Sequence, residues 1–216
     1  MSTEGFALAR AVRSTAGKLF LAVYRTRFIG EENVPRDTGA ILAGNHVSYL
    51  DPALLWCGAP RHVHFMARSA LFEQGLIGWG LPRLWSFPVK RGEPDRAAIG
   101  TATDLLKAGE LVGIFPEGTR VRHGGADAEL GEGQGGVAFI AMRAGVPVVP
   151  VGIAGTDLAM PPGAKLPRFP RVTFRYFDPV HPDDFTEGGR KERVAAMTEE
   201  IMRRIAAARD QARGER

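Results

Sequence analysis

Short apolar runs alternate along the chain with longer segments in which apolar residues recur every three or four positions. Apolar runs of this kind are typical of buried strands, and they occupy residues 40–43, 62–67, 86–89, 111–115, 146–153 and 172–177. The helical period extends over residues 51–58, 94–108, 134–144 and 188–213. This alternation predicts an α/β fold, a single domain in which helices flank a mixed, largely parallel sheet.

The N-terminal segment, residues 5–27, lacks proline and mixes apolar residues with Arg10, Arg13 and Lys18. The pattern predicts a basic amphipathic helix, for which two interpretations stand. The helix lies at a membrane interface, or it packs one face on the core and leaves its cations in water. Its longest purely apolar stretch, residues 19–24, is far shorter than the roughly 20 residues that cross a bilayer, so we expect no span here.

Two other apolar regions contain residues that interrupt regular structure. Residues 69–88 hold two of the three tryptophans among glycines and a proline, and they form either core or an aromatic edge in lipid headgroups. The run at 146–153 contains Pro147 and Pro150. Because proline cannot donate a ladder hydrogen bond, we expect this run to avoid a central position in the sheet.

Composition adds limits rather than a function. A chain of 216 residues that is 44% hydrophobic can bury one sizeable core. The net charge of +4 admits anionic lipids, phosphorylated metabolites or nucleic acid as partners. Cys57 is the single cysteine, so an intramolecular disulfide is excluded and a reducing compartment is expected.

The strongest chemical signal is the segment that contains Asn45, His46 and Asp51. It follows the strand run at 40–43, and α/β folds expose reactive groups at the carboxyl ends of their strands. A carboxylate five residues after a histidine can accept its Nδ1 proton if a loop separates them, since one continuous helix would point them apart. Nε2 is then available as a general base. A covalent role for Ser48 is disfavoured, because no Gly-x-Ser-x-Gly elbow is present.

Two other predicted strand ends carry polar side chains suited to a phosphorylated acceptor. In Phe-Pro-Glu-Gly-Thr-Arg, residues 115–120, Glu117 can accept hydrogen bonds from hydroxyls and Arg120 can bind phosphate with both arms of its guanidinium. Lys90 and Arg91 follow the run at 86–89. In a parallel sheet these cations would emerge on the same edge as His46; a structural turn and solvated cations are the alternatives.

Metal and nucleotide sites are disfavoured. His62 and His64 share one strand face but have no further ligand at metal-binding spacing. The glycines of residues 131–136 match a dinucleotide fingerprint, yet a polar segment and no strand precedes them. We therefore expect no metal ion and no bound organic cofactor.

Taken together and in chain order, four blocks resemble the glycerolipid acyltransferase family, whose familiar members acylate lysophosphatidic acid: the His-x4-Asp block, the Phe-Pro-Val-Lys-Arg block at 87–91, the Phe-Pro-Glu-Gly-Thr-Arg block and the Val-Pro run. The resemblance runs over about residues 29–153. It implies that His46 is the general base and Asp51 its orienting carboxylate. It also implies an acceptor and phosphate site made of Lys90, Arg91, Glu117, Gly118, Thr119 and Arg120.

The resemblance further implies an O-acyltransferase that moves an acyl group from a thioester, on coenzyme A or acyl carrier protein, to 1-acylglycerol 3-phosphate in phospholipid biosynthesis. Residues 1–28 would be a membrane-interface helix and residues 29–216 the acyltransferase domain. The expected location is cytoplasmic, peripheral on the inner face of the cell membrane, with no nucleic acid partner. The alternatives are another acceptor, such as glycerol 3-phosphate, a lyso-ornithine lipid or a glycolipid, or a non-catalytic lipid-binding module.

Overall fold

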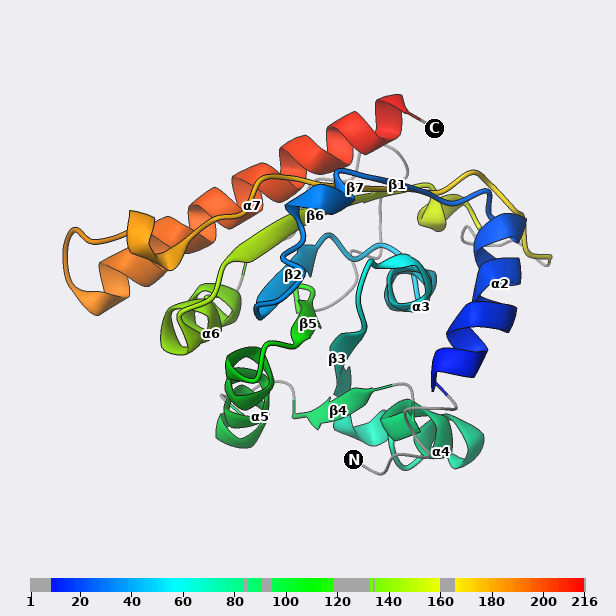
Figure 1. Cartoon of the computed structure of the whole chain (residues 1–216), viewed down its shortest axis with the longest axis horizontal. Coiled ribbons are helices and arrows are strands. Elements are labelled where there is room, and N and C mark those ends of the chain that lie inside the picture. Colours follow the sequence, from blue (N-terminus) through cyan, green and yellow to red (C-terminus); the bar gives the residue numbers. More distant parts are fainter. Residues whose placement is uncertain are drawn as a thin grey trace.

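A seven-stranded sheet lies at the centre of the computed structural model, which describes residues 9–83, 85–90, 95–118, 133, 135–159 and 166–215. The strand order is β1-β7-β6-β2-β5-β3-β4 (Figure 1). The strands are β1 (Arg27–Ile29), β2 (Ala40–Gly44), β3 (Val63–Arg68), β4 (Ser86–Val89), β5 (Leu111–Ile114), β6 (Val148–Ala154) and β7 (Thr173–Tyr176). Neighbouring strands are parallel except β6 and β7. The predicted mixed, largely parallel sheet is confirmed.

Helices cover both faces of this sheet. The longer ones are α2 (Lys18–Val23), α3 (Leu50–Gly58), α4 (Gly75–Arg83), α5 (Arg96–Lys107), α6 (Gly136–Ala144) and α7 (Arg190–Gly214). A π-helix, η1 (Arg13–Gly17), precedes α2, and short 3-10 turns are η2 (Glu31–Asn33), η3 (Ser69–Leu71), η4 (Thr156–Leu158) and η5 (Pro182–Asp184). Figure 1 shows α5, α6 and α7 on one side and α2 and α3 on the other.

Each face of the sheet has its own buried cluster. On the α7 side, Met197, Ile201 and Ile205 are at most 1% exposed and pack on β2 residues such as Ile41. The burial of each such side chain stabilises the fold by roughly 1.5–3 kcal/mol. The helix lies so close to β6 that a side chain at Gly152 would overlap the backbone of Ala208. This packing fixes β6, and through it the neighbouring end of β2.

The N-terminal helix is shorter than predicted. Helical backbone is described from residue 9 to Val23, with η1 as its middle part, instead of continuing to residue 27. The chain turns at Arg25, which has a φ of 44°, and then forms β1 beside β7. The aromatic ring of Phe28 stacks on Phe174 at 5.0 Å between centroids. The strand is favoured over further helix here because it packs this partly buried ring on the core.

The position expected for the Val-Pro run is wrong. Strand β6, which contains Pro150, pairs with β2 on one side and β7 on the other, and all its residues are buried. Proline removes only a donor. The carbonyl oxygen of Pro150 accepts from the N–H of Phe177 at 2.9 Å, and the carbonyl oxygen of Pro147 accepts from the N–H of Ile41 at 3.0 Å. The retained acceptors and the apolar burial outweigh one missing ladder bond.

The aromatic region at 69–88 divides between core and surface. Trp85 is buried at 2% exposure, whereas Leu76 and Trp79 of α4 are 87% and 58% exposed. Helix α4 ends one residue after Pro82. Among the described residues, no helix combines the length and the apolar character needed to cross a membrane.

Candidate active site

The site begins where β2 leaves the middle of the sheet. Asn45, the next residue, is 2% exposed and makes two hydrogen bonds with one backbone position of β6. Its side-chain amide donates to the carbonyl oxygen of Ile153 at 2.9 Å, and its side-chain oxygen accepts from the Ile153 N–H at 2.7 Å. The side chain thus continues the β2–β6 ladder for one further step and fixes the point from which His46 projects.

His46 and Asp51 form a buried pair. The Nδ1 atom of His46 lies 2.9 Å from Oδ2 of Asp51, and the two side chains are 11% and 0% exposed. The same Oδ2 also accepts the backbone N–H groups of Val47 at 2.8 Å and Ser48 at 2.7 Å. An oxygen that accepts from two N–H groups is a carboxylate acceptor, so the His46 proton lies on Nδ1 and Nε2 has the lone pair.

The pair depends on the loop between β2 and α3. Helix α3 begins at Leu50, so Asp51 stands in its first turn rather than before it. The hydroxyl of Ser48 accepts from the Leu50 N–H at 3.3 Å, a local turn-stabilising contact of the kind that serine makes at helix starts. Ser48 therefore supports the loop, while the carboxylate of Asp51 reaches back across it to the imidazole.

Two groups from the segment after β5 position His46 from the other side. Phe115 stacks on the imidazole, with 4.2 Å between ring centroids and 19° between planes. Glu117, which is 7% exposed, accepts the backbone N–H of His46 through Oε1 at 3.2 Å. Strand β5 pairs directly with β2, which explains why His46 meets residues that lie 69 and 71 positions further along the chain.

The remaining predicted acceptor residues are only partly described. Gly118 has a φ of 66° and its N–H donates to the carbonyl of Phe115 at 3.0 Å, closing a tight turn. Lys90 is exposed and follows β4 at the same sheet edge, three strand spacings or about 14 Å from β2. Its backbone N–H donates to Asp95 at 2.8 Å. The other predicted phosphate ligands, Arg91, Thr119 and Arg120, lie outside the described residues.

No group of three metal-ligating side chains occurs within the described part of the chain. His62 and His64 instead lie against Trp85, at 4.0 and 5.0 Å between ring centroids. Burial, aided by neighbouring Arg13, lowers the pKa of His62 to about 4, and burial with the adjacent His62 lowers that of His64 to about 4. Both rings are neutral at pH 7.

Sequence reasoning named His46, Asp51 and Glu117 but did not assign positioning roles to Asn45 and Phe115. Both flank motif residues, so position was a signal that could have found them. Their partners, Ile153 and the imidazole, come from other segments, which only the sheet register brings together.

Comparisons with known proteins agree with this geometry. The family model described as Acyltransferase matches residues 25–154. The chain is 36% identical to the 1-acyl-sn-glycerol-3-phosphate acyltransferase of Bacillus subtilis, over 81% of this chain and 83% of that one. A chloroplast enzyme of that name from Brassica napus is 36% identical over 66% of this chain, which spans only 41% of the plant protein.

A solved structure shares the fold. The crystal structure of the 1-acyl-sn-glycerophosphate (LPA) acyltransferase PlsC from Thermotoga maritima matches with a TM-score of 0.72 and 26% sequence identity. The match covers 94% of this chain and 80% of the other. The likeness therefore extends over nearly the whole chain.

Proposed function

Since the chain belongs to the acyltransferase family, we propose that it transfers an acyl group from a thioester to the free hydroxyl of 1-acylglycerol 3-phosphate and so makes phosphatidic acid. The observation that carries the proposal is the buried contact of 2.9 Å between His46 and Asp51 at the carboxyl end of β2. The names of the relatives support the choice of acceptor. The donor would be acyl coenzyme A or acyl carrier protein.

In the proposed reaction, Nε2 of His46 removes the proton of the acceptor hydroxyl as its oxygen attacks the thioester carbonyl. Asp51 stabilises the imidazolium that forms. When the tetrahedral intermediate collapses, the carbon–sulfur bond breaks and the imidazolium returns its proton to the leaving thiolate. General base catalysis contributes roughly 10² to 10⁴ in rate, and the positioning of two long amphiphiles contributes more. No metal ion or organic cofactor takes part in these steps.

The acceptor phosphate would lie at the same edge as His46. We propose Arg91 and Arg120 as its guanidinium ligands, with Lys90 nearby and the turn of Glu117, Gly118 and Thr119 beside the acceptor hydroxyls. Glu117 also holds the His46 backbone, so the acceptor loop and the base are mechanically connected. A shift of this loop would therefore alter both acceptor binding and the position of the imidazole.

A location on the cytoplasmic face of the membrane is part of the same proposal. Large apolar side chains are exposed near the start of α3 and on α4: Tyr49 is 73%, Leu76 87% and Trp79 58% exposed. Leu19 of α2 is 68% exposed on the basic N-terminal helix. Residues of this type suit the boundary between headgroups and acyl chains. Flotation with vesicles tests this part.

The decisive experiment compares His46→Ala with His181→Ala, which removes an exposed histidine before η5. Thiol release from acyl coenzyme A is measured with 1-acylglycerol 3-phosphate as the acceptor, and urea unfolding verifies the fold of each variant. We expect loss of turnover in His46→Ala alone. Near-normal turnover by a folded His46→Ala variant would exclude the mechanism, and a preference for glycerol 3-phosphate or a lyso-ornithine lipid would change the acceptor.

A further inference from the structure

A hollow of about 500 Å³ opens at the amino ends of the central strands, at the opposite end of the sheet from His46. We call it the N-terminal hollow; its walls include Arg10, Arg13 and Lys18 from the first helix, together with Cys57 and His62. Helices α2 and α3 lie side by side around it (Figure 1). Because His62 precedes β3 while His46 follows β2, a strand length of about 17 Å separates the two levels.

Three cations, Arg10, Arg13 and Lys18, line this hollow. No ion pair within 4.0 Å involves Arg10, Arg13 or Lys18 in the part of the chain that the structure describes. Arg13 uses its Nε–H to donate to the carbonyl of Cys57 at 3.1 Å. Burial lowers the pKa of Arg13, and Glu31 is the weakest of the influences that oppose this shift.

One carboxyl group offsets the charge of these three cations only in part. Glu31 also lines the hollow, but burial and the neighbouring Glu32 raise the pKa of its carboxyl, and Arg13 opposes that rise only as the smallest of the three influences. His62 reports the same excess of positive charge, because Arg13 and Arg10 add to burial in lowering its pKa. The hollow is therefore electropositive and partly shielded from water.

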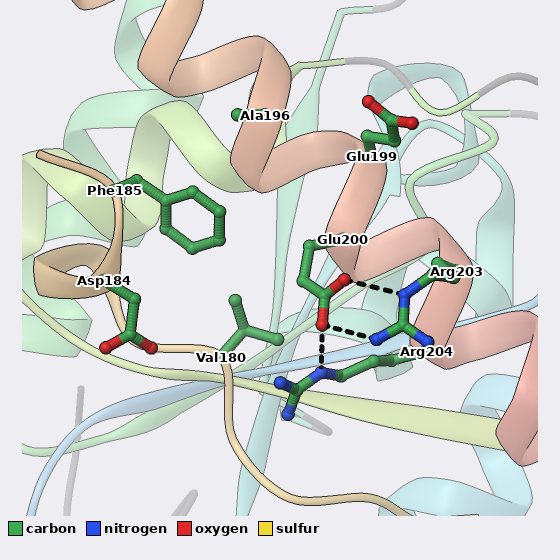
Figure 2. Close-up of a pocket in the computed structure, with 8 residues that line it drawn as sticks. All are labelled: Val180, Asp184, Phe185, Ala196, Glu199, Glu200, Arg203 and Arg204. Atoms are coloured by element: carbon green, nitrogen blue, oxygen red, sulfur yellow. Dashed lines mark hydrogen bonds and ion pairs between the residues drawn. The ribbon is translucent and has the colours of Figure 1, made fainter. Parts of the chain in front are cut away.

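Another hollow, of about 410 Å³ between α7 and η5, shows what a neutralised arrangement looks like (Figure 2). There Glu200 accepts from Arg203 at 2.7 Å and from Arg204 at 2.6 Å. The dashed contacts in Figure 2 account for both guanidinium groups. Both cations of that hollow therefore have a carboxylate partner, whereas no ion pair to the three cations of the N-terminal hollow is found in the described part of the chain.

We propose that the N-terminal hollow is a binding site for a phosphate group, with Arg10, Arg13 and Lys18 as its cationic ligands. Guanidinium groups match phosphate oxygens in shape and charge. Leu21 and Phe28 also line the hollow, so there is an apolar surface for a chain attached to the phosphate. A lipid headgroup and free phosphate share this chemistry. The site is separate from the acceptor site beside His46.

Cys57 provides a direct reporter of occupancy. It is the only cysteine of the chain and lines the hollow. Alkylation by uncharged iodoacetamide, measured by mass spectrometry, therefore reports on this position alone. The full chain is treated with 1-hexanoylglycerol 3-phosphate, with inorganic phosphate, or with 1-hexanoylglycerol, which has the chain but no phosphate. We expect 1-hexanoylglycerol 3-phosphate to slow the alkylation of Cys57 several-fold and saturably, and 1-hexanoylglycerol not to slow it.

Slowing by inorganic phosphate at similar concentrations would identify free phosphate as the ligand; slowing by the lipid phosphate alone would identify a headgroup. In Arg10→Gln, which leaves the hydrogen bond from Arg13 to Cys57 in place, the half-protecting concentration should rise roughly tenfold. Arg204→Gln is the matched control and should leave it unchanged. The proposal is overturned if neither phosphate slows alkylation, if 1-hexanoylglycerol slows it equally, or if Arg10→Gln protects like the parent chain.

Discussion

The two ends of the central strands differ in how their charged side chains are paired. At the carboxyl end of β2, the carboxylate of Asp51 is met by His46 and by two backbone N–H groups within 2.9 Å. At the amino ends of the central strands, Arg10 and Arg13 line the N-terminal hollow with His62, and neither forms an ion pair within the described residues. The first end holds its histidine in a fixed position before substrate binds and so suits proton transfer, which needs fixed geometry. The second end gains from an external anion and so suits binding.

Removal of the charge at the matched end should have the largest effect. In Asp51→Asn, a neutral amide can no longer stabilise the imidazolium or hold the Nδ1–H tautomer, so turnover should fall about 10³- to 10⁴-fold. Initial rates of thiol release with 1-acylglycerol 3-phosphate measure this. If Asp51→Asn retains a tenth or more of the activity, the carboxylate acts only in the loop and His46 has another partner.

The framework beneath that site comes next. Asn45→Ala leaves the buried N–H and carbonyl of Ile153 without their partners, which should lower the free energy of unfolding by roughly 2–3 kcal/mol and the rate about tenfold through a misplaced His46. Asn33→Ala is the control, because Asn33 makes one partly buried bond, to the Tyr176 carbonyl at 3.3 Å. Urea unfolding compares them. Equal losses in both variants would contradict a special role for Asn45.

The two ends also differ in how far sequence alone predicts them. His46 and Asp51 lie five positions apart, so their meeting follows from a strand, a loop and a helix start that local patterns indicate. The Asn45–Ile153 contact spans 108 positions and depends on β6 lying beside β2. The Val-Pro run gave the opposite expectation, because the missing donor of Pro150 was weighed without the burial that the central position provides.

The N-terminal helix and β1 also differ in how far the sequence predicts them. A basic helix was predictable from residue type and period, whereas β1 was not, because three residues carry too little pattern. Phe28 becomes a strand residue only through its stacking on Phe174. Likewise, the Arg10 and Arg13 charges were visible in the sequence, but their convergence on His62 results from the packing of the first helix beside α3.

The amino end should lose stability in acid. The pKa of His64 is about 4 when folded, lowered by burial and by His62, against 6.5 when unfolded. Between these values the unfolded chain binds the proton first, so the stability that is present above pH 6.5 declines as the pH falls towards 4. We expect a loss of about 2 kcal/mol from this group. Urea unfolding from pH 7 to 4.5 tests it, and His64→Gln should flatten the slope; an unchanged slope would contradict the assignment.

The smallest effect should also have the opposite sign. Arg10→Gln removes a cation that repels the neighbouring cation of Arg13, so the free energy of unfolding should rise by about 0.3 kcal/mol at low salt. Arg204→Gln removes a cation that pairs with Glu200 and donates to the Asp178 carbonyl at 3.0 Å, so it should lose about 0.5–1 kcal/mol. Urea midpoints measured at 20 mM and 500 mM salt separate the effect of charge from that of packing. The electrostatic screening lengths at these two concentrations are roughly 20 and 4 Å. The gain in Arg10→Gln should vanish at high salt; a loss at both would mean that Arg10 has a partner in the fold, and the contrast between the two ends would then be wrong.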